Sequence, residues 1–114
     1  MARSTQKVFE DHGMAIASGD MDKLMADYAE DAILLTLDRS YVGKEAIQAF
    51  FEETFAGMPN LQITPKGLAV EGDTLIVHWS ADSDTVSVPE AVDTMVIRDD
   101  KIQRQTAWFQ AVPK

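Results

Sequence analysis

The chain has 114 residues and no cysteine, so one domain accounts for its length and disulfide bonds or thiolate chemistry are excluded. Its 10 Lys and Arg residues against 19 Asp and Glu residues give a formal net charge of −9. Nucleic acid and anionic membrane surfaces would repel such a chain, and we expect neither as a partner. No apolar run approaches the roughly 20 residues of a membrane span. Residues 1–6 lack the apolar core of a signal peptide, so we expect a cytoplasmic protein.

The first half of the sequence is mainly helical in its pattern. Apolar side chains at three- and four-residue spacing predict helices over 5–18, 21–28 and 44–56. Gly19 suits the left-handed position just past the first helix. His12 lies on the apolar stripe of that helix, facing the predicted core.

The second half reads as strands joined by short polar turns. Strands are predicted over 32–37, from 61 onward, over 68–81 with a turn at 71–73, and over 85–98 and 102–112. Pro65 and Gly67 interrupt the strand that starts at 61, which indicates a sheet edge or a bulge. Because helices precede strands, the order predicts an α+β fold. Three helices on one side of a curved, mainly antiparallel sheet would leave a cavity between the two layers.

Asp93 is the most informative residue, because aspartate is depleted in the middle of strands. Both faces of the strand over 85–98 are largely apolar, so we expect the sheet to be covered on both sides, with a second subunit on the outer face. Burial disfavours the charged form, and we expect Asp93 to act as a neutral hydrogen-bond donor or general acid. The alternative is an ion pair with Arg104, or a bond to a buried amide.

The two histidines are weaker candidates. His12 is either a core residue or, if it faces the same cavity as Asp93, a group that shares a proton or orients a ligand oxygen. His78 and Trp79 alternate along their strand, so only one of them can face the cavity, and the sequence does not decide which. Their spacing gives no metal motif, and we expect no metal. The acidic residues within 20–31 are expected to form a solvated helix face.

Four segments together resemble one superfamily: Ser18-Gly19-Asp20 and the stretches 28–32, 41–47 and 93–102. The order of these segments resembles that in the nuclear-transport-factor-2-like superfamily, most of all in its SnoaL-like and ketosteroid-isomerase-like branch. The resemblance covers nearly the whole chain and implies a single SnoaL-like domain over 1–114. It implies a cone-shaped α+β barrel with a strongly curved mixed sheet, an apolar pocket, and a homodimer formed through the outer face of the sheet. A chain of about a hundred residues cannot easily enclose a large cofactor, and we expect none.

The resemblance also implies roles for particular residues. Asp93 falls where ketosteroid isomerases hold a protonated aspartic acid in their oxyanion hole, which implies an acid role for it here. His12 falls at the position of their oxyanion-hole tyrosine. Thr36 falls where they have the carboxylate base, which counts against steroid isomerase activity. Asp38, two residues on, could act near the pocket mouth. The other residues expected around the pocket are Ile16, Tyr28, Phe50, Phe55, His78, Ala91, Met95, Gln105 and Phe109.

Three functional hypotheses follow. The first is an isomerase, cyclase or hydrolase for an apolar, carbonyl-bearing small molecule, with Asp93 as acid or acid/base and His12 at the substrate oxygen. The second is a non-catalytic dimeric domain that binds an apolar ligand. The third is an interaction module whose pocket is incidental.

Overall fold

The computed structural model describes residues 3–114, and the predicted α+β class is confirmed. Met1 and Ala2, the start of the segment considered for a signal peptide, lie outside the described residues. The helices are α1 (Thr5–Ser18), α2 (Met21–Ala26) and α3 (Lys44–Gly57). The strands are β1 (Tyr28–Leu35), β2 (Ser40–Val42), β3 (Gln62–Glu71), β4 (Thr74–Asp82), β5 (Val86–Arg98) and β6 (Lys101–Pro113).

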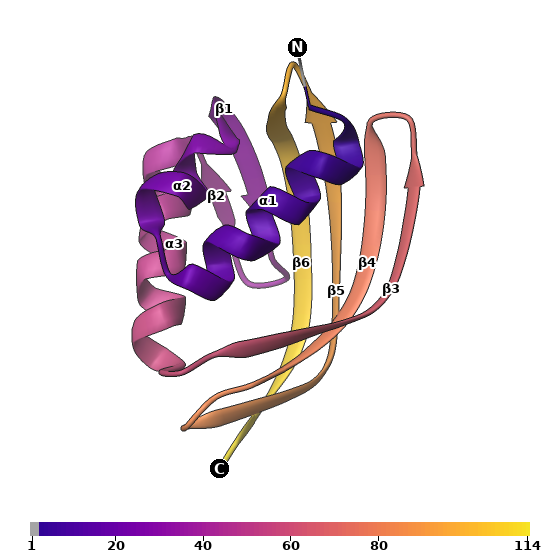
Figure 1. The fold of residues 1–114 in the computed structure, drawn as a ribbon. Helices are drawn as coiled ribbons and strands as arrows, with labels where there is room; N and C mark the ends of the chain where they lie inside the picture. Colours follow the sequence, from indigo (N-terminus) through magenta and orange to yellow (C-terminus); the bar gives the residue numbers. More distant parts are fainter. Residues whose placement is uncertain (1–2) are drawn as a thin grey trace.

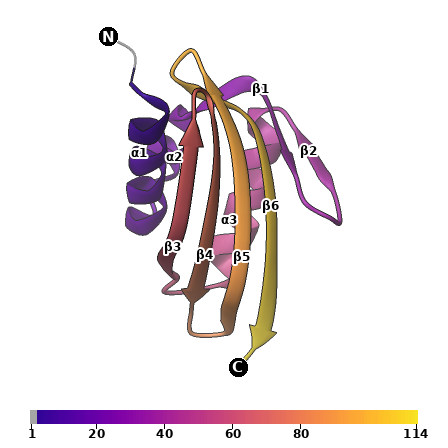
Figure 2. The ribbon, with the colours of Figure 1, turned by 90° about the vertical axis from the view of Figure 1, so that its right-hand side faces the viewer.

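The six strands form one curved mixed sheet in the order β2-β1-β6-β5-β4-β3. β1 runs parallel to β6, and all the other neighbours are antiparallel. The three helices lie on the same side of this sheet (Figures 1 and 2). β2 and β3 remain as free edges, so the implied barrel is a curved sheet that does not close.

Local signals place the ends of the first helices. The Ser4 side chain accepts from the Lys7 N–H at the start of α1, and Gly19 ends the helix with φ of 68°, in the left-handed region. Asp20 caps α2 by accepting from the Lys23 N–H. The prediction that this helix extends to Tyr28 is wrong, because Tyr28 pairs with β6 and begins β1.

The boundaries of β1 also differ from the prediction of 32–37. The strand starts earlier and ends at Leu35, and a turn leads into the short β2, which the sequence pattern did not reveal. In that turn the Thr36 N–H donates to the Arg39 carbonyl at 2.9 Å. β3 confirms the prediction of an edge or a bulge: it is an edge strand, and its register shifts between Pro65 and Gly67.

The main core lies between the helices and the inner face of the sheet. Its fully buried members include Val8, Leu24, Leu34, Ile47 and Ile102. Burial of such side chains is the dominant favourable term in folding.

Arg3 joins three parts of the chain beside this core. Its guanidinium pairs with Asp11 of α1 at 3.1 Å, with Asp27 ahead of β1 at 2.9 Å and with Asp100 of the β5–β6 turn at 3.0 Å. Asp27 is buried, with only 4% of its surface exposed, so the expectation that all the acids within 20–31 are solvated is wrong for this residue.

The outer face of the sheet carries a mixture of apolar and polar side chains. Ile76, Val92 and Trp108 lie there, and Ile76 and Trp108 are 48% and 44% exposed. Arg104 stands opposite Val96 on the same face, away from Asp93, so the alternative of an Asp93–Arg104 ion pair is wrong. Within residues 3–114, no helix has the length and apolar character needed to cross a membrane.

Candidate functional site

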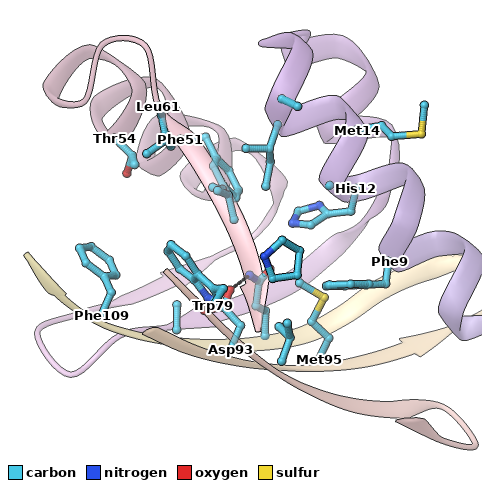
Figure 3. A pocket seen from close by; sticks show the side chains of 18 of the residues that line it. Phe9, His12, Met14, Phe51, Thr54, Leu61, Trp79, Asp93, Met95 and Phe109 are labelled. Atoms are coloured by element: carbon cyan, nitrogen blue, oxygen red, sulfur yellow. Dashed lines mark hydrogen bonds between the residues drawn. The ribbon is translucent and has the colours of Figure 1, made fainter. Parts of the chain in front are cut away.

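A cavity of about 760 Å³ lies between α1, α3 and the inner face of the sheet. Figure 3 shows His12 reaching in from α1, Phe51 from α3, and Trp79, Asp93 and Met95 from the sheet. The lining side chains are mostly aromatic or aliphatic. Its aromatic residues are Phe9, Phe50, Phe51, Phe55, Trp79 and Phe109. Its charged residues, among the described part of the chain, are Glu10 and Asp93, and no Lys or Arg lines it.

The structure brings most of the predicted site residues together around this cavity. Those that line it are His12, Ile16, Phe50, Phe55, Asp93, Met95, Gln105 and Phe109. They come from α1, α3, β5 and β6, which are distant in sequence but adjacent in the fold.

Five predicted residues lie elsewhere. Thr36 and Asp38 are in the turn after β1, because that strand ends at Leu35 instead of continuing toward the mouth. His78 faces the outer side of the sheet and bonds to Glu90.

The other two are buried behind the cavity wall. Tyr28 is 1% exposed, and its hydroxyl bonds to Gln105. Ala91 is fully buried and packs with Val88 in a second apolar cluster, next to Trp79.

The sequence left open which of His78 and Trp79 faces inward, and the structure assigns that place to Trp79. The inward position of Trp79 follows from the pairing of β4 with β5, which places Val77 opposite Asp93 and Trp79 opposite Ala91 on the inner face. Other lining residues were also missing from the predicted set: Phe9, Phe51 and Thr54 from the helices, and Leu61, Ile63 and Pro65 from the segment that leads into β3 and its first residues. Only the spatial arrangement of the chain places this last group at the cavity.

Asp93 sits in the middle of β5 and receives two N–H donors. Trp79 Nε1 donates to Oδ1 at 3.1 Å, and Gln105 Nε2 donates to Oδ2 at 2.9 Å. Burial raises the pKa of Asp93 from 3.8 to about 6, while these two hydrogen bonds oppose the rise because they stabilise the carboxylate. The upward shift has the expected direction and cause, but at a pKa of about 6 most Asp93 side chains are ionised at pH 7.

His12 lies across the cavity from Asp93 (Figure 3). Its ring packs edge-on against Tyr28 at 5.7 Å and against Phe51 at 6.2 Å, measured between ring centroids. Burial lowers the pKa of His12 to about 4, so the imidazole is neutral near pH 7. Its Nδ1 atom is buried and has no hydrogen-bond partner within the described residues. A neutral imidazole has one donor and one acceptor nitrogen, and can therefore bind a ligand oxygen without adding charge.

At this site a partly buried carboxylate faces a neutral imidazole in a cavity with aromatic walls. Among residues 3–114, no group of three or more His, Asp or Glu side chains is placed to hold a metal ion.

The curved open sheet with three helices over one face belongs to the nuclear-transport-factor-2-like class of folds. Within that class, the chain belongs to the SnoaL-like domain family, whose family model matches residues 9–105. A comparison with curated proteins gave no significant match.

Solved structures with similar folds come from several bacteria. An NTF-2 like protein of unknown function from Burkholderia xenovorans is 21% identical, with a TM-score of 0.80 over 93% of this chain and 82% of that one. A putative polyketide cyclase from Sinorhizobium meliloti is 19% identical, with a TM-score of 0.79 over 90% of this chain and 94% of that one. A putative ketosteroid isomerase from Kribbella flavida is 16% identical, with a TM-score of 0.81 over 96% and 80%. At these identities the likeness shows the fold.

Proposed function

We propose that the protein is a cofactor-independent acid/base catalyst of the isomerase or cyclase type, which moves a proton next to the carbonyl group of an apolar small molecule. The observation that carries the proposal is Asp93, a carboxylate that lines the cavity, has a pKa of about 6 and receives an N–H donor on each oxygen. A base is most useful when its pKa lies near the working pH, and burial has moved this one toward it.

In the proposed step, the Asp93 carboxylate takes a proton from the carbon next to the carbonyl group. The electron pair of the broken C–H bond forms a C=C bond, and the carbonyl π electrons move to the oxygen, which becomes an enolate. Asp93, now a carboxylic acid, returns its proton to the same carbon or to another carbon of the ligand. Loss of the proton at one carbon and its gain at another is an isomerisation.

In the proposed step, His12 stabilises the developing negative charge on the ligand oxygen. It faces Asp93 across the cavity, and its low pKa makes it a neutral donor near pH 7. Donors that are already oriented in a water-poor site stabilise a transition state without reorganisation.

The charge pattern of the cavity favours an uncharged ligand. Its charged lining groups are the carboxylates Glu10 and Asp93, and no lining cation could pair with a carboxylate or phosphate on the ligand. Burying an unpaired anion beside Asp93 would be costly. The aromatic walls favour a ligand with flat rings, so we propose a neutral, ring-bearing ketone, ester or lactone.

Exchange of the C1 protons of 2-tetralone in D₂O tests this chemistry, because this ketone is neutral, bicyclic and acidic at C1. We expect the protein to accelerate loss of the C1 proton signal in NMR spectra, and Asp93→Asn to lower the rate at least about a hundredfold. Asp38→Asn is the matched control, since it makes the same change to a carboxylate in the turn outside the cavity.

Two results would contradict the proposal. Exchange that survives Asp93→Asn would remove Asp93 as the base. Binding of 2-tetralone with no exchange above the buffer rate would instead favour the alternative function, a non-catalytic domain for an apolar ligand.

We also propose that the protein forms a homodimer in which a second copy covers the outer face of the sheet. Support comes from the exposed apolar side chains there, including Ile76 and Trp108. Light scattering at micromolar concentration should give twice the chain mass, and Trp108→Asp should give the mass of one chain. We also propose a cytoplasmic location, because a chain without cysteine suits a reducing compartment.

A further inference from the structure

We infer that Tyr28, which lies outside the cavity, is a positioning residue for Asp93: its hydroxyl fixes the Gln105 side-chain amide so that Asp93 always meets an N–H group. The effect on the Asp93 carboxyl does not depend on what the protein binds. Its catalytic meaning rests on the proposed function, in which Asp93 is the base.

The three side chains form a continuous chain of hydrogen bonds that runs from the buried Tyr28 and Gln105 to Asp93 at the cavity. The Tyr28 hydroxyl donates to Gln105 Oε1 at 2.5 Å, and Gln105 Nε2 donates to Asp93 Oδ2 at 2.9 Å. Tyr28 is 1% exposed and Gln105 is 4% exposed, so bulk water does not compete for these groups.

Only one orientation of the Gln105 amide satisfies this chain while Asp93 is ionised. A carboxylamide has an acceptor oxygen and a donor nitrogen, and a half-turn about its last side-chain bond exchanges them. After that turn, the amide oxygen would face the carboxylate, so two acceptors would meet. The nitrogen would face the Tyr28 oxygen, and the tyrosine proton would lose the partner it has now.

Tyr28 maintains this orientation because it keeps its proton. Burial, followed by the nearby carboxylates Asp93 and Asp27, raises the pKa of Tyr28 well above its ordinary value. The hydroxyl therefore keeps its proton in the range where Asp93 titrates, and it donates to the Gln105 amide oxygen.

The consequence concerns the protonated form of Asp93. A neutral Asp93 could bond to Gln105 through its own O–H only if the amide turned its oxygen toward it. Tyr28 opposes that turn and so favours the ionised carboxylate against the effect of burial. The other titratable groups at the cavity are Glu10 and His12, both from α1.

Titration of the Asp93 carboxyl carbon by NMR, in the free protein, tests the inference. We expect Tyr28→Phe to move the Asp93 titration to higher pH, with the ionised-to-neutral ratio at a given pH lowered about tenfold, because the amide becomes free to turn. Tyr41→Phe removes a hydroxyl from the other tyrosine of the chain, outside the cavity, and should leave the titration unchanged.

Repeating Tyr28→Phe in a variant that lacks the Gln105 amide tests whether Tyr28 acts on Asp93 through that amide. In Gln105→Met the donor to Oδ2 is lost, so the Asp93 titration should again move to higher pH. Adding Tyr28→Phe to that variant should then change nothing further. An equal effect of Tyr28→Phe with and without Gln105, or no effect in either background, would overturn the inference.

Tyr28→Phe keeps the ring that packs on His12 and Phe51, so we expect the variant to fold. A measurement on the unmodified protein gives an independent test. The Tyr28 hydroxyl proton signal should remain that of a hydrogen-bonded proton on both sides of the Asp93 titration, and its loss on the acid side would show that the amide turns.

The Asp93 titrations can succeed or fail independently of the 2-tetralone experiment, because they use no ligand and no turnover. If 2-tetralone exchange is found, Tyr28→Phe should also shift its pH–rate profile to higher pH in parallel with the Asp93 titration. A purely structural role would lower the rate without moving the profile.

Discussion

Asp93→Asn should change how the stability of the fold depends on pH. Folded Asp93 keeps its proton up to a pKa of about 6, whereas an unperturbed aspartate loses it near 3.8. Between these values the folded state binds more protons than the unfolded state, so stability falls as pH rises. At about 1.4 kcal/mol per pKa unit, full ionisation of Asp93 lowers the free energy of unfolding by about 3 kcal/mol. About 2 kcal/mol of this falls between pH 4.5 and 7.

Urea denaturation of both proteins from pH 4.5 to 7 measures this cost. All other titrating groups are shared, so they cancel in the difference between the two free energies of unfolding. Asparagine also changes the bonds to Trp79 and Gln105, but that contribution does not vary with Asp93 ionisation. We expect the wild type to lose about 2 kcal/mol relative to Asp93→Asn across the range. Parallel curves would show that Asp93 titrates as it does in the unfolded chain and would refute the reasoning.

Three further substitutions test separate features. Trp79→Phe removes the donor to Asp93 Oδ1 and should raise the Asp93 pKa, seen by carbon NMR, whereas Trp108→Phe on the outer face should not. Gly19→Ala should lower the free energy of unfolding, measured by urea denaturation, by about 1 kcal/mol, because φ at Gly19 is 68°. We expect no larger loss, since a Cβ at Gly19 would meet no atom within 4 Å. A stabilising Gly19→Ala would contradict this. Leu24→Ala should lower the free energy of unfolding by about 2–5 kcal/mol in the same assay, since Leu24 is fully buried. A loss below about 1 kcal/mol would mean that the core collapses around the gap.

The sequence predicted those parts of the fold that local signals determine. Ser4, Gly19 and Asp20 mark helix ends through their own side chains or backbone conformation, so α1 and the start of α2 were found correctly. Tyr28 was misplaced because its conformation depends on parallel pairing with Ile102, which is far away in the sequence. No local pattern reports such a partner.

The site was predictable in part for a similar reason. Asp93 stands out in any apolar strand, and His12 stands out on an apolar helix stripe. The inward position of Trp79 depends on the register of β4 against β5, which also shifts between Trp79 and Ala81. Thr36 was placed at the pocket by the family resemblance, and Asp38 by its position two residues further on. Both lie in the turn instead, because β1 ends at Leu35.

The strand order also has a consequence for folding. Trp79, Asp93 and Gln105 lie on β4, β5 and β6, which are joined in sequence by two tight hairpins. Tyr28 reaches them only through the parallel β1–β6 pair, which closes a loop spanning most of the chain. Short loops close at a lower entropic cost than long ones, and long-range contacts slow folding. The carboxyl and its two donors are thus encoded in one contiguous segment, whereas the residue that orients one of those donors arrives through the most distant pairing in the sheet.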